Sequence, residues 1–566
     1  MTSLRIAFAA ALLAATTAAA PSAGAGPKIA PSDPRSWAPI DPQQLSQTVR
    51  VLASDAYQGR GPGTAGETRT IAYLIDRFRR LGLEPGGPGG RWTQDVPLIR
   101  TQLDTSGTAS LSVGGQTIAL RFPDDIYLGT TRDTDRARIA AAPVVFVGYG
   151  VSAPERQWDD FKGVDLKGKV ALFLVNDPDF EAAPGDPVAG RFAGRAMTFY
   201  GRWVYKYEEA ARRGAIAAIL VHESAGAGYG WNTVQAPGGE SYNVVLKPGA
   251  LQPVLLQGWI QRPAAEDLFR RAGLDFEAAK RQARTAGFRP IDLGASFSAD
   301  FAVRTSRVPS HNVIARITGR KRPGESVMFA AHWDAYGVGA PDARGKTIRP
   351  GAADDGLGLA GVIEIARAFK AGPPPDRTLL FAAWTAEERG LLGSETFAQS
   401  ALYPMDRMAA NITLDTLETA GPARDVILIG QGQNELEDRM ARLAAEQGRT
   451  VTPDARPERG LFYRADHFTM AKRGVPVLLL MALGGGPDLV AGGRAAGDRW
   501  VADYTAHCYH QTCDEWRPDW DLRGAAQDVA LAYAVGRELA FTSDWPRWKP
   551  SSEFRAVREQ SAASRR

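Results

Sequence analysis

The stretch LLFAAWTAEERGLLGS, residues 379–394, joins an apolar run to two adjacent acids, Glu387 and Glu388. A continuous apolar run is typical of a strand that is buried on both faces of a sheet. Neighbouring carboxylates repel each other, and neither acid helps to bury the end of a strand. We therefore interpret the pair as functional.

Apolar runs of the same kind occur on both sides of this stretch. SVMFAAHWD (326–334), AANITLDTLE (409–418) and GVPVLLLMAL (474–483) read as strands, and DDGLGLAGVIEIARAFKAG (354–372) has the spacing of an amphipathic helix. This alternation predicts an α/β fold with a mixed, largely parallel sheet covered by helices on both faces. In such sheets ligands bind beyond the carboxyl ends of the strands, where the acids and histidines of this chain lie.

A second, β-rich unit is predicted between residues 100 and 300. Short apolar runs such as APVVFVGYG (142–150) and KVALFLVND (169–177) dominate it. We divide the chain into five segments: a signal peptide (1–25), an N-terminal part of the main domain (40–135), an inserted β-rich domain (136–295), the main part (296–545) and a polar C-terminal tail (546–566).

The composition narrows the class of protein. The chain has 566 residues with 67 basic and 63 acidic side chains, a formal net charge of +4, and no long run of either sign. This argues against a nucleic-acid footprint, which needs clustered Lys and Arg. Residues 1–25 combine a positive start, an Ala-rich apolar stretch too short to span a membrane and a small-residue cleavage site. We expect a periplasmic or secreted protein with no stable membrane insertion after cleavage.

Histidines and acids recur at the predicted strand ends. His332 and Asp334 form H-x-D after one run, and Asp354 and Asp355 occupy a Gly-flanked turn before a helix. One Asp suffices to cap a helix, so the second is unexplained unless it binds a metal. The remaining candidates are Glu387, Glu388, Asp415 and His510. Two imidazoles and three carboxylates are enough for two zinc ions with open positions.

The two cysteines of the chain, Cys508 and Cys513, lie in HCYHQTCDEW beside His510. In an exported protein such a pair can form a disulfide, although two free thiols or a zinc site within CYHQTC are alternatives. The histidines His222 and His311 are expected to be structural, and His311 is expected to make a local hydrogen bond.

The motifs HWD, GAADDGLG, EERGLLGS, LDTLE, ADH and YHQTCD occur in this order. The set resembles the di-zinc aminopeptidase family (metallopeptidase clan MH), which also contains glutamate carboxypeptidases, glutaminyl cyclases and transferrin receptors. LASDAYQGRGPGTAGE (52–67) is similar to the opening segment of that family. The β-rich unit resembles the protease-associated domain inserted in its bacterial members.

This resemblance implies two zinc ions per chain. His332 and Asp415 would bind one ion, Glu388 and His510 the other, and Asp354 would bridge them; its peptide bond with the supporting Asp355 is often cis in relatives. It also favours the Cys508–Cys513 disulfide, which would fix the loop of His510. Asp334 is expected to orient His332 through its carboxylate.

The resemblance also implies a mechanism. Glu387 would be the general base for a metal-bound hydroxide, and Tyr509 would donate to the developing oxyanion. Asp466 and His467 of ADH would line the substrate cleft. Leu357 and Ala465 depart from the Ser that is common in the family, which puts contacts around ADH in doubt.

The expected activity is therefore that of an exported zinc aminopeptidase acting on peptides. A carboxypeptidase of the glutamate-releasing type is one alternative, and it would require a cationic group for a substrate carboxylate; the sequence does not show which Arg enters the cleft. A glutaminyl cyclase, which usually works with a single zinc, and a silent receptor-like binding protein are further alternatives. The oligomeric state and the side-chain preference cannot be predicted.

Overall fold

A computed structural model describes residues 40–565, so the predicted signal peptide lies outside the described residues. Within them the central sheet has the order β21-β18-β14-β17-β13. The strands β14 (Arg322–His332), β17 (Arg377–Trp384), β18 (Met408–Leu414) and β21 (Val477–Leu480) run parallel, and β13 (Ile291–Ile317) runs antiparallel to β17. This is the mixed, largely parallel sheet that the apolar runs predict.

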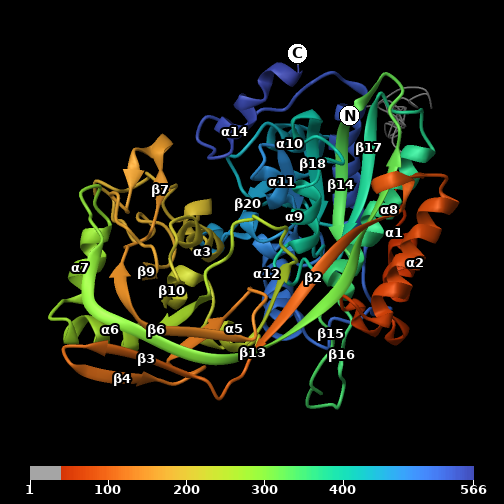
Figure 1. The fold of residues 1–566 in the computed structure, drawn as a ribbon. Coiled ribbons are helices and arrows are strands. Elements are labelled where there is room, and N and C mark those ends of the chain that lie inside the picture. Colours follow the sequence, from red (N-terminus) through yellow and green to blue (C-terminus); the bar gives the residue numbers. More distant parts are fainter. Residues whose placement is uncertain (1–39, 566) are drawn as a thin grey trace, which may run out of the picture.

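Helices cover both faces of this sheet because successive side chains of each strand point to opposite sides. Val327 and Phe329 of β14 pack into one core, and Met328 and Ala330 pack into the other. The first core is covered by α1 (Pro42–Leu52), α2 (Ala65–Arg80), α8 (Leu357–Lys370), α10 (Leu436–Glu446) and α13 (Arg523–Phe541), and the second by α9 (Leu392–Ala398) and α11 (His467–Ala471). Figure 1 shows α1, α2 and α8 on the right of the sheet and α9 and α11 on its left.

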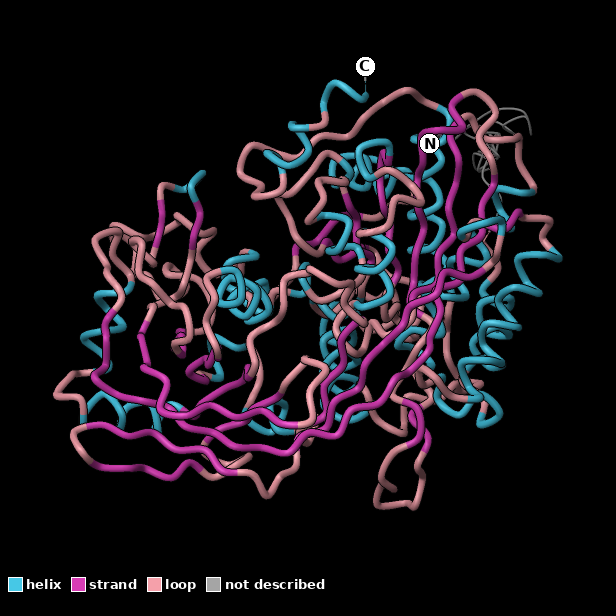
Figure 2. Tube along the Cα trace, in the orientation of Figure 1, coloured by secondary structure: helices cyan, strands magenta, loops and turns pink. Residues whose placement is uncertain are grey.

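The strand β13 is 27 residues long and links this sheet to a second group of strands. Its C-terminal end pairs with β17, its middle pairs with β2 (Thr93–Leu103), and its N-terminal part pairs with β3 (Thr108–Val113) and β6 (Arg136–Phe146). In Figures 1 and 2 the strand runs along the bottom of the molecule from the left part to the right part.

The second group of strands has its own apolar cores and forms what we call the β-rich module. Its path is β6-β9-β10-β12-β5. Further elements of the module include β4 (Gln116–Leu120), β5 (Ile126–Gly129), β7 (Ser152–Ala153), β8 (Trp158–Asp159), β9 (Val170–Leu174), α3 (Trp203–Arg212), β10 (Ala217–His222), α4 (Ser224–Ala227), α5 (Trp231–Gln235), β11 (Glu240–Val244), β12 (Leu256–Gln261), α6 (Arg262–Arg271) and α7 (Phe276–Ala283). Strands β3 to β5 therefore belong to it, and the boundary predicted near residue 136 falls inside the module. These strands are assigned to the module by the strand pairing with β13, and the local sequence pattern does not reveal that pairing.

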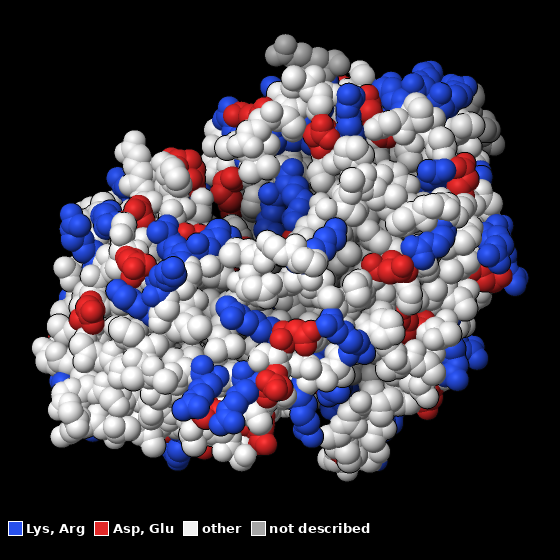
Figure 3. All heavy atoms as spheres, in the orientation of Figure 1, with Lys and Arg blue, Asp and Glu red and all other residues white. Residues whose placement is uncertain are grey.

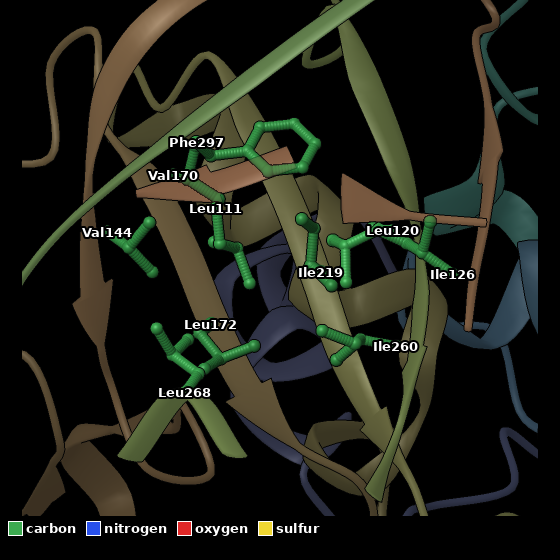
Figure 4. Close-up of a pocket in the computed structure, with 10 residues that line it drawn as sticks. All are labelled: Leu111, Leu120, Ile126, Val144, Val170, Leu172, Ile219, Ile260, Leu268 and Phe297. Atoms are coloured by element: carbon green, nitrogen blue, oxygen red, sulfur yellow. The ribbon is translucent and has the colours of Figure 1, made fainter. Parts of the chain in front are cut away.

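Ten apolar side chains line a small pocket inside the module, as Figure 4 shows. They come from β3, β4, β5, β6, β9, β10, β12, β13 and α6. Because the lining offers no polar group that could orient a ligand, we interpret this pocket as a packing gap of the core.

The C-terminal segment packs on the main domain, contrary to the predicted polar tail. Trp548 is 4% exposed and Phe554 is 3% exposed, and both lie in the core below α9 and α11. The Trp548 indole N–H donates to the carbonyl of Gly474 (2.8 Å). The two aromatic residues of this otherwise polar segment indicate that it packs on the domain, but the overall composition of the segment does not reveal this. Of the described residues, none forms a helix long and apolar enough to cross a membrane.

Candidate metal centre

The carboxyl ends of the parallel strands bring the predicted ligands together. His332 is the last residue of β14 and is in register with Trp384, the last residue of β17. Asp415 directly follows β18, and Glu388 lies four residues beyond the end of β17. Asp354 lies in the turn before α8, and His510 lies in the loop before α13.

Two groups of three possible ligands share Asp354. His332, Asp354 and Asp415 form one group, and Asp354, Glu388 and His510 form the other, with the ligand atoms of each group within 4.8 Å of one another. One Asp354 oxygen lies 3.2 Å from His332 Nε2, and the other lies 3.2 Å from His510 Nε2. His510 Nε2 is also 3.2 Å from Glu388 Oε2. This is the division of ligands that the resemblance implies.

The chemistry of both groups fits zinc. Neither His332 Nε2 nor His510 Nε2 makes a hydrogen bond within residues 40–565, although both are buried. Buried polar atoms are rarely left without a partner. Imidazole nitrogen and carboxylate oxygen are zinc ligands, and each group of three leaves room for a further ligand.

The site concentrates negative charge in a buried place. Burial raises the pKa of Glu387 and of Glu388 well above the usual value, and neighbouring carboxylates add to this effect. Burial, with the charge of Asp354, raises the pKa of Asp415 to about 6. Since repulsion between like charges makes this arrangement costly, bound cations would stabilise it.

The backbone after β17 separates the two adjacent acids. Ala386 has φ +52°, a left-handed conformation that is unusual for a residue with a side chain, and it turns the chain at the strand end. Glu388 Oε2 then faces His510, whereas Glu387 Oε2 lies 3.9 Å from His332 Nε2 on the other group. The two carboxylates therefore have different neighbours and can do different jobs.

The partner of His332 differs from the prediction. His332 Nδ1 lies 3.0 Å from the main-chain carbonyl oxygen of Asp334, and the Asp334 carboxylate is farther away, at 3.7 Å. The carboxylate instead accepts a hydrogen bond from the main-chain N–H of Glu387 (3.0 Å). Because a carbonyl only accepts, Nδ1 carries the proton and Nε2 has a lone pair for a metal. Asp334 thus holds the turn of the two acids, and its main chain orients the imidazole.

Two carboxylates hold the turn that carries Asp354. Asp355 accepts from the main-chain N–H groups of His332 (3.1 Å) and Gly358 (2.9 Å), so it joins β14 to the start of α8. Asp514 accepts from the N–H groups of Ala353 (2.9 Å) and Asp354 (3.1 Å). The Asp354–Asp355 peptide bond is cis. Asp514 is the last letter of YHQTCD, and we did not single it out in the sequence.

Two tyrosines lie beside His510. The Tyr509 ring is 3.6 Å from the His510 ring, and burial together with Asp354 raises the Tyr509 pKa well above its usual value. Tyr336 lies 4.5 Å from the same ring, and its pKa is also raised by burial. Both phenols therefore stay protonated and can donate. Tyr336 was missed in the sequence, although it lies two residues after HWD.

The two polar residues of ADH separate in the structure. Asp466 is 1% exposed, and burial raises its pKa to about 7, in the field of His332 and Asp415. His467 is fully buried, its ring packs edge to face against Phe462 at 4.9 Å, and burial lowers its pKa to about 3. His467 is therefore a core residue and does not line the cleft as predicted.

Arg60 supports the site from the N-terminal segment. It is fully buried and donates to the carbonyls of Trp333 (2.7 Å), Leu52 (3.2 Å), Pro350 (2.6 Å) and Gly351 (2.7 Å). Gln58, Gly59 and Arg60 itself have φ values of +50°, +63° and +49°. A left-handed backbone at non-glycine residues is costly and persists where surrounding contacts fix it. Arg60 lies inside the opening segment quoted above, but its sequence gives no sign of this role.

The loop of His510 is closed by a disulfide between Cys508 and Cys513, with Cα atoms 5.0 Å apart. The thiols are therefore not metal ligands in this structure. His311, expected to bond locally, instead pairs with Glu67, 244 residues away, at 3.0 Å.

Comparison with known proteins finds a family match for part of the main domain. Residues 312–534 match Peptidase family M28. A probable zinc metalloprotease of Pyrenophora teres f. teres (strain 0-1) is 36% identical over 103 residues, which cover 18% of this chain and 22% of that protein. A glutamate carboxypeptidase 2 homolog of Caenorhabditis elegans is 25% identical over 340 residues, which cover 49% of this chain and 38% of that protein. The match thus spans well under half of these two curated relatives.

Among solved structures, an aminopeptidase from Aneurinibacillus sp. strain AM-1 is similar, with a TM-score of 0.48 and 17% identity over 89% of this chain and 95% of that chain. The order of the motifs, the sheet that carries them and the match over residues 312–534 all point to the same family. Residues 312–534 of the chain therefore match Peptidase family M28, and the strand ends of this region carry most of the candidate ligands.

Proposed function

We propose that this protein is an exported, zinc-dependent aminopeptidase that removes N-terminal residues from peptides. The observation that carries the proposal is the pair of His and carboxylate groups joined by Asp354, with the free carboxylate of Glu387 beside them. A site for a single metal ion would not explain why one oxygen of Asp354 faces His332 and the other faces His510.

His332 and Asp415 would hold one zinc ion, Glu388 and His510 the second, and Asp354 both. When bound, the ions would polarise the scissile carbonyl and lower the pKa of a water molecule. Glu387 would take a proton on Oε2 and return it to the leaving amine. The main-chain N–H of Glu387 donates a hydrogen bond to the Asp334 carboxylate. This bond fixes the backbone from which the Glu387 side chain extends. Tyr509 would donate a hydrogen bond from its phenol to the developing oxyanion.

Export is supported by two features. The first 25 residues have the composition of a signal peptide. The Cys508–Cys513 disulfide is the kind of bond that persists in oxidising compartments.

A carboxypeptidase is the second candidate, and Arg464 favours it. Its positive charge partly offsets the rise that burial causes in the pKa of Asp415, and it adds to the fall that burial causes in the pKa of His510. Its side chain forms no ion pair with a described carboxylate. A cation in this position could bind the carboxylate of a C-terminal residue.

The test combines metal content with substrate chemistry. Mass spectrometry of the mature protein should find about two zinc ions per chain, and hydrolysis should require a free α-amine and be lost on chelation. Cleavage of N-blocked dipeptides would favour the carboxypeptidase, and one zinc per chain would contradict the two-ion site.

The Glu387→Gln variant should retain zinc and lose at least about a hundredfold in kcat, since a general base contributes about 10²–10⁴-fold. Glu446→Gln, an exposed position on α10, is the matched control. Full activity of Glu387→Gln would rule out its role as base.

A further inference from the structure

The loop that carries the two adjacent acids of the metal centre is in contact with a strand of the β-rich module. We call residues 385–391, which join β17 to α9, the acid loop. Ala386 and Leu392 lie near the two ends of this loop and belong to one small apolar core. Tyr242 and Val244 of β11 pack against that core. The module therefore touches the turn from which both acids extend.

The strand β11 is fixed from two sides. It pairs antiparallel with β2 along its whole length. The N–H of Gly239, just before β11, donates to the phenol of Tyr127 on β5 (3.0 Å), and the Asn243 side-chain amide donates to the carbonyl of Thr131 (3.3 Å). Because β5 and the segment after it are parts of the module, β11 joins the module to the acid loop.

Arg389, directly after the two acids, bridges β11 and the metal centre. Its guanidinium carbon lies 5.1 Å from the centre of the Tyr242 ring and 5.0 Å from that of the Tyr336 ring, which are cation–π distances. Arg389 Nη1 also lies 3.5 Å from Glu240 Oε1 of β11. The Tyr336 ring is in turn 4.5 Å from the His510 ring. A continuous row of contacts thus leads from the module to a ligand proposed for the second zinc ion.

The contact of Arg389 with β11 differs from the surface ion pairs of this region. Figure 3 shows acidic and basic side chains side by side over β2 and β13 on the face in view, and exposed pairs contribute little to stability. The side chains of Arg389 and Glu240 are only 20% and 19% exposed. Arg389 Nε is buried without a hydrogen-bond partner among residues 40–565. Ring contacts and one ion pair therefore hold this planar group, which suits a guanidinium better than an ammonium.

Glu388 depends on the acid loop for its position. Metal ligands are usually oriented by a second set of contacts around them. Within residues 40–565 the Glu388 carboxylate has one potential donor, His510 Nε2, at 3.2 Å. Its place is therefore set by the backbone of the acid loop, which Ala386 and Arg389 attach to β11.

We propose that β11 and Arg389 position Glu388 and His510 for the second zinc ion, so that the β-rich module sets the affinity of that ion. Arg389 and Tyr242 are positioning residues, because they act on the ligands through packing and are not ligands themselves. This inference rests on the two-ion site of the proposed function. It gives the module a task in completing the metal centre.

The test measures the two stepwise zinc affinities of the full chain by competition with a chromophoric chelator. His510→Ala, which removes a ligand of the second ion, identifies the second step. Arg389→Met should weaken the second step at least about tenfold, since contacts that orient metal ligands are worth about 10–100-fold in affinity, and should leave the first within about twofold. Loss of a positive charge by itself strengthens cation binding, so a charge effect predicts the opposite sign.

Conservative variants separate positioning from general stability. Tyr242→Phe keeps the ring and should match the wild type, whereas Tyr242→Leu should weaken the second step at least about threefold. Arg389→Lys keeps the charge without the planar group and should recover part of the loss. Arg213→Gln is the matched control in the body of the module, because Arg213 also lies over a ring (Phe161, 3.7 Å) and pairs with Glu209 (2.7 Å). A second step that neither Arg389→Met nor Tyr242→Leu weakens, or an equal loss in both steps, would overturn the proposal.

Hydrogen exchange of the metal-free protein separates this inference from the proposed function. The N–H groups of Gly390 and Leu391 donate to the carbonyl of Glu387 (2.9 and 3.0 Å), so their exchange reports on the acid loop. Arg389→Met should speed this exchange at least about fivefold relative to the control, because the loop loses its attachment to β11.

The outcomes can be told apart. A wild type that hydrolyses no peptide but shows the expected zinc and exchange shifts would contradict the proposed activity alone, and the positioning would stand. An active two-zinc protein in which Arg389→Met changes neither exchange nor the second step would overturn the positioning alone. A single zinc step in the wild type would contradict both.

Discussion

Replacing Arg60 with Met is expected to destabilise the peptidase domain by removing the donor for a set of buried carbonyls. Arg60 joins the end of α1 (Leu52 O), the end of β14 (Trp333 O) and the loop before Asp354 (Pro350 O and Gly351 O). Met fills a similar volume, so the change tests hydrogen bonding and charge more than packing.

The size of the effect follows from the carbonyls left behind. Gly351 O also accepts from the N–H of Gly356 (3.1 Å), whereas Arg60 is the donor described for the other three. A buried acceptor without a partner costs about 1–3 kcal/mol, so the sum is about 3–9 kcal/mol. Water that enters the space would bring the cost to the lower end of this range. At about 2 °C per kcal/mol for a large domain, Tm should fall by about 6 °C or more.

The assay is a thermal melt of the wild type, Arg60→Met and a control, each with zinc and with a chelator. Arg80→Met is the control, because Arg80 is 75% exposed and its ion pair with Asp76 is worth about 1 kcal/mol or less. The loss should appear in both conditions, since it arises from the protein's own carbonyls. A fall below about 2 °C, or one that appears only with zinc, would refute the reasoning.

Two further predictions concern other parts of the fold. The hydrogen bond to Glu67 raises the pKa of His311 above its unfolded value, so the stabilisation is complete below about pH 6.5 and is lost as pH rises through the folded pKa. The Tm deficit of His311→Gln relative to the wild type should therefore be larger at pH 5.5 than at pH 9, and equal deficits would contradict it. Trp548→Ala should cost about 3–5 kcal/mol, as for other buried aromatic residues, whereas Val557→Ala, at a position that is 38% exposed, should change Tm by less than about 1 °C. A tail that does not pack on the domain would give the same Tm for both variants.

The sequence predicts the central sheet and most of the metal centre for one physical reason. Buried parallel strands are continuous apolar runs, and a ligand at a strand end is the first polar residue after such a run. His332 and Asp415 fit this rule, and Glu387 and Glu388 follow it after a short turn. Each of these residues can therefore be recognised from its own segment of the sequence.

What the sequence could not predict depends on contacts between distant segments. The carbonyls that saturate Arg60 come from three places in the chain, and a lone Arg between two glycines gives no sign of them. The strands β3 to β5 read as part of the first domain until their pairing with β13 is known. His467 follows Asp466 directly, yet packing against Phe462 removes it from the site.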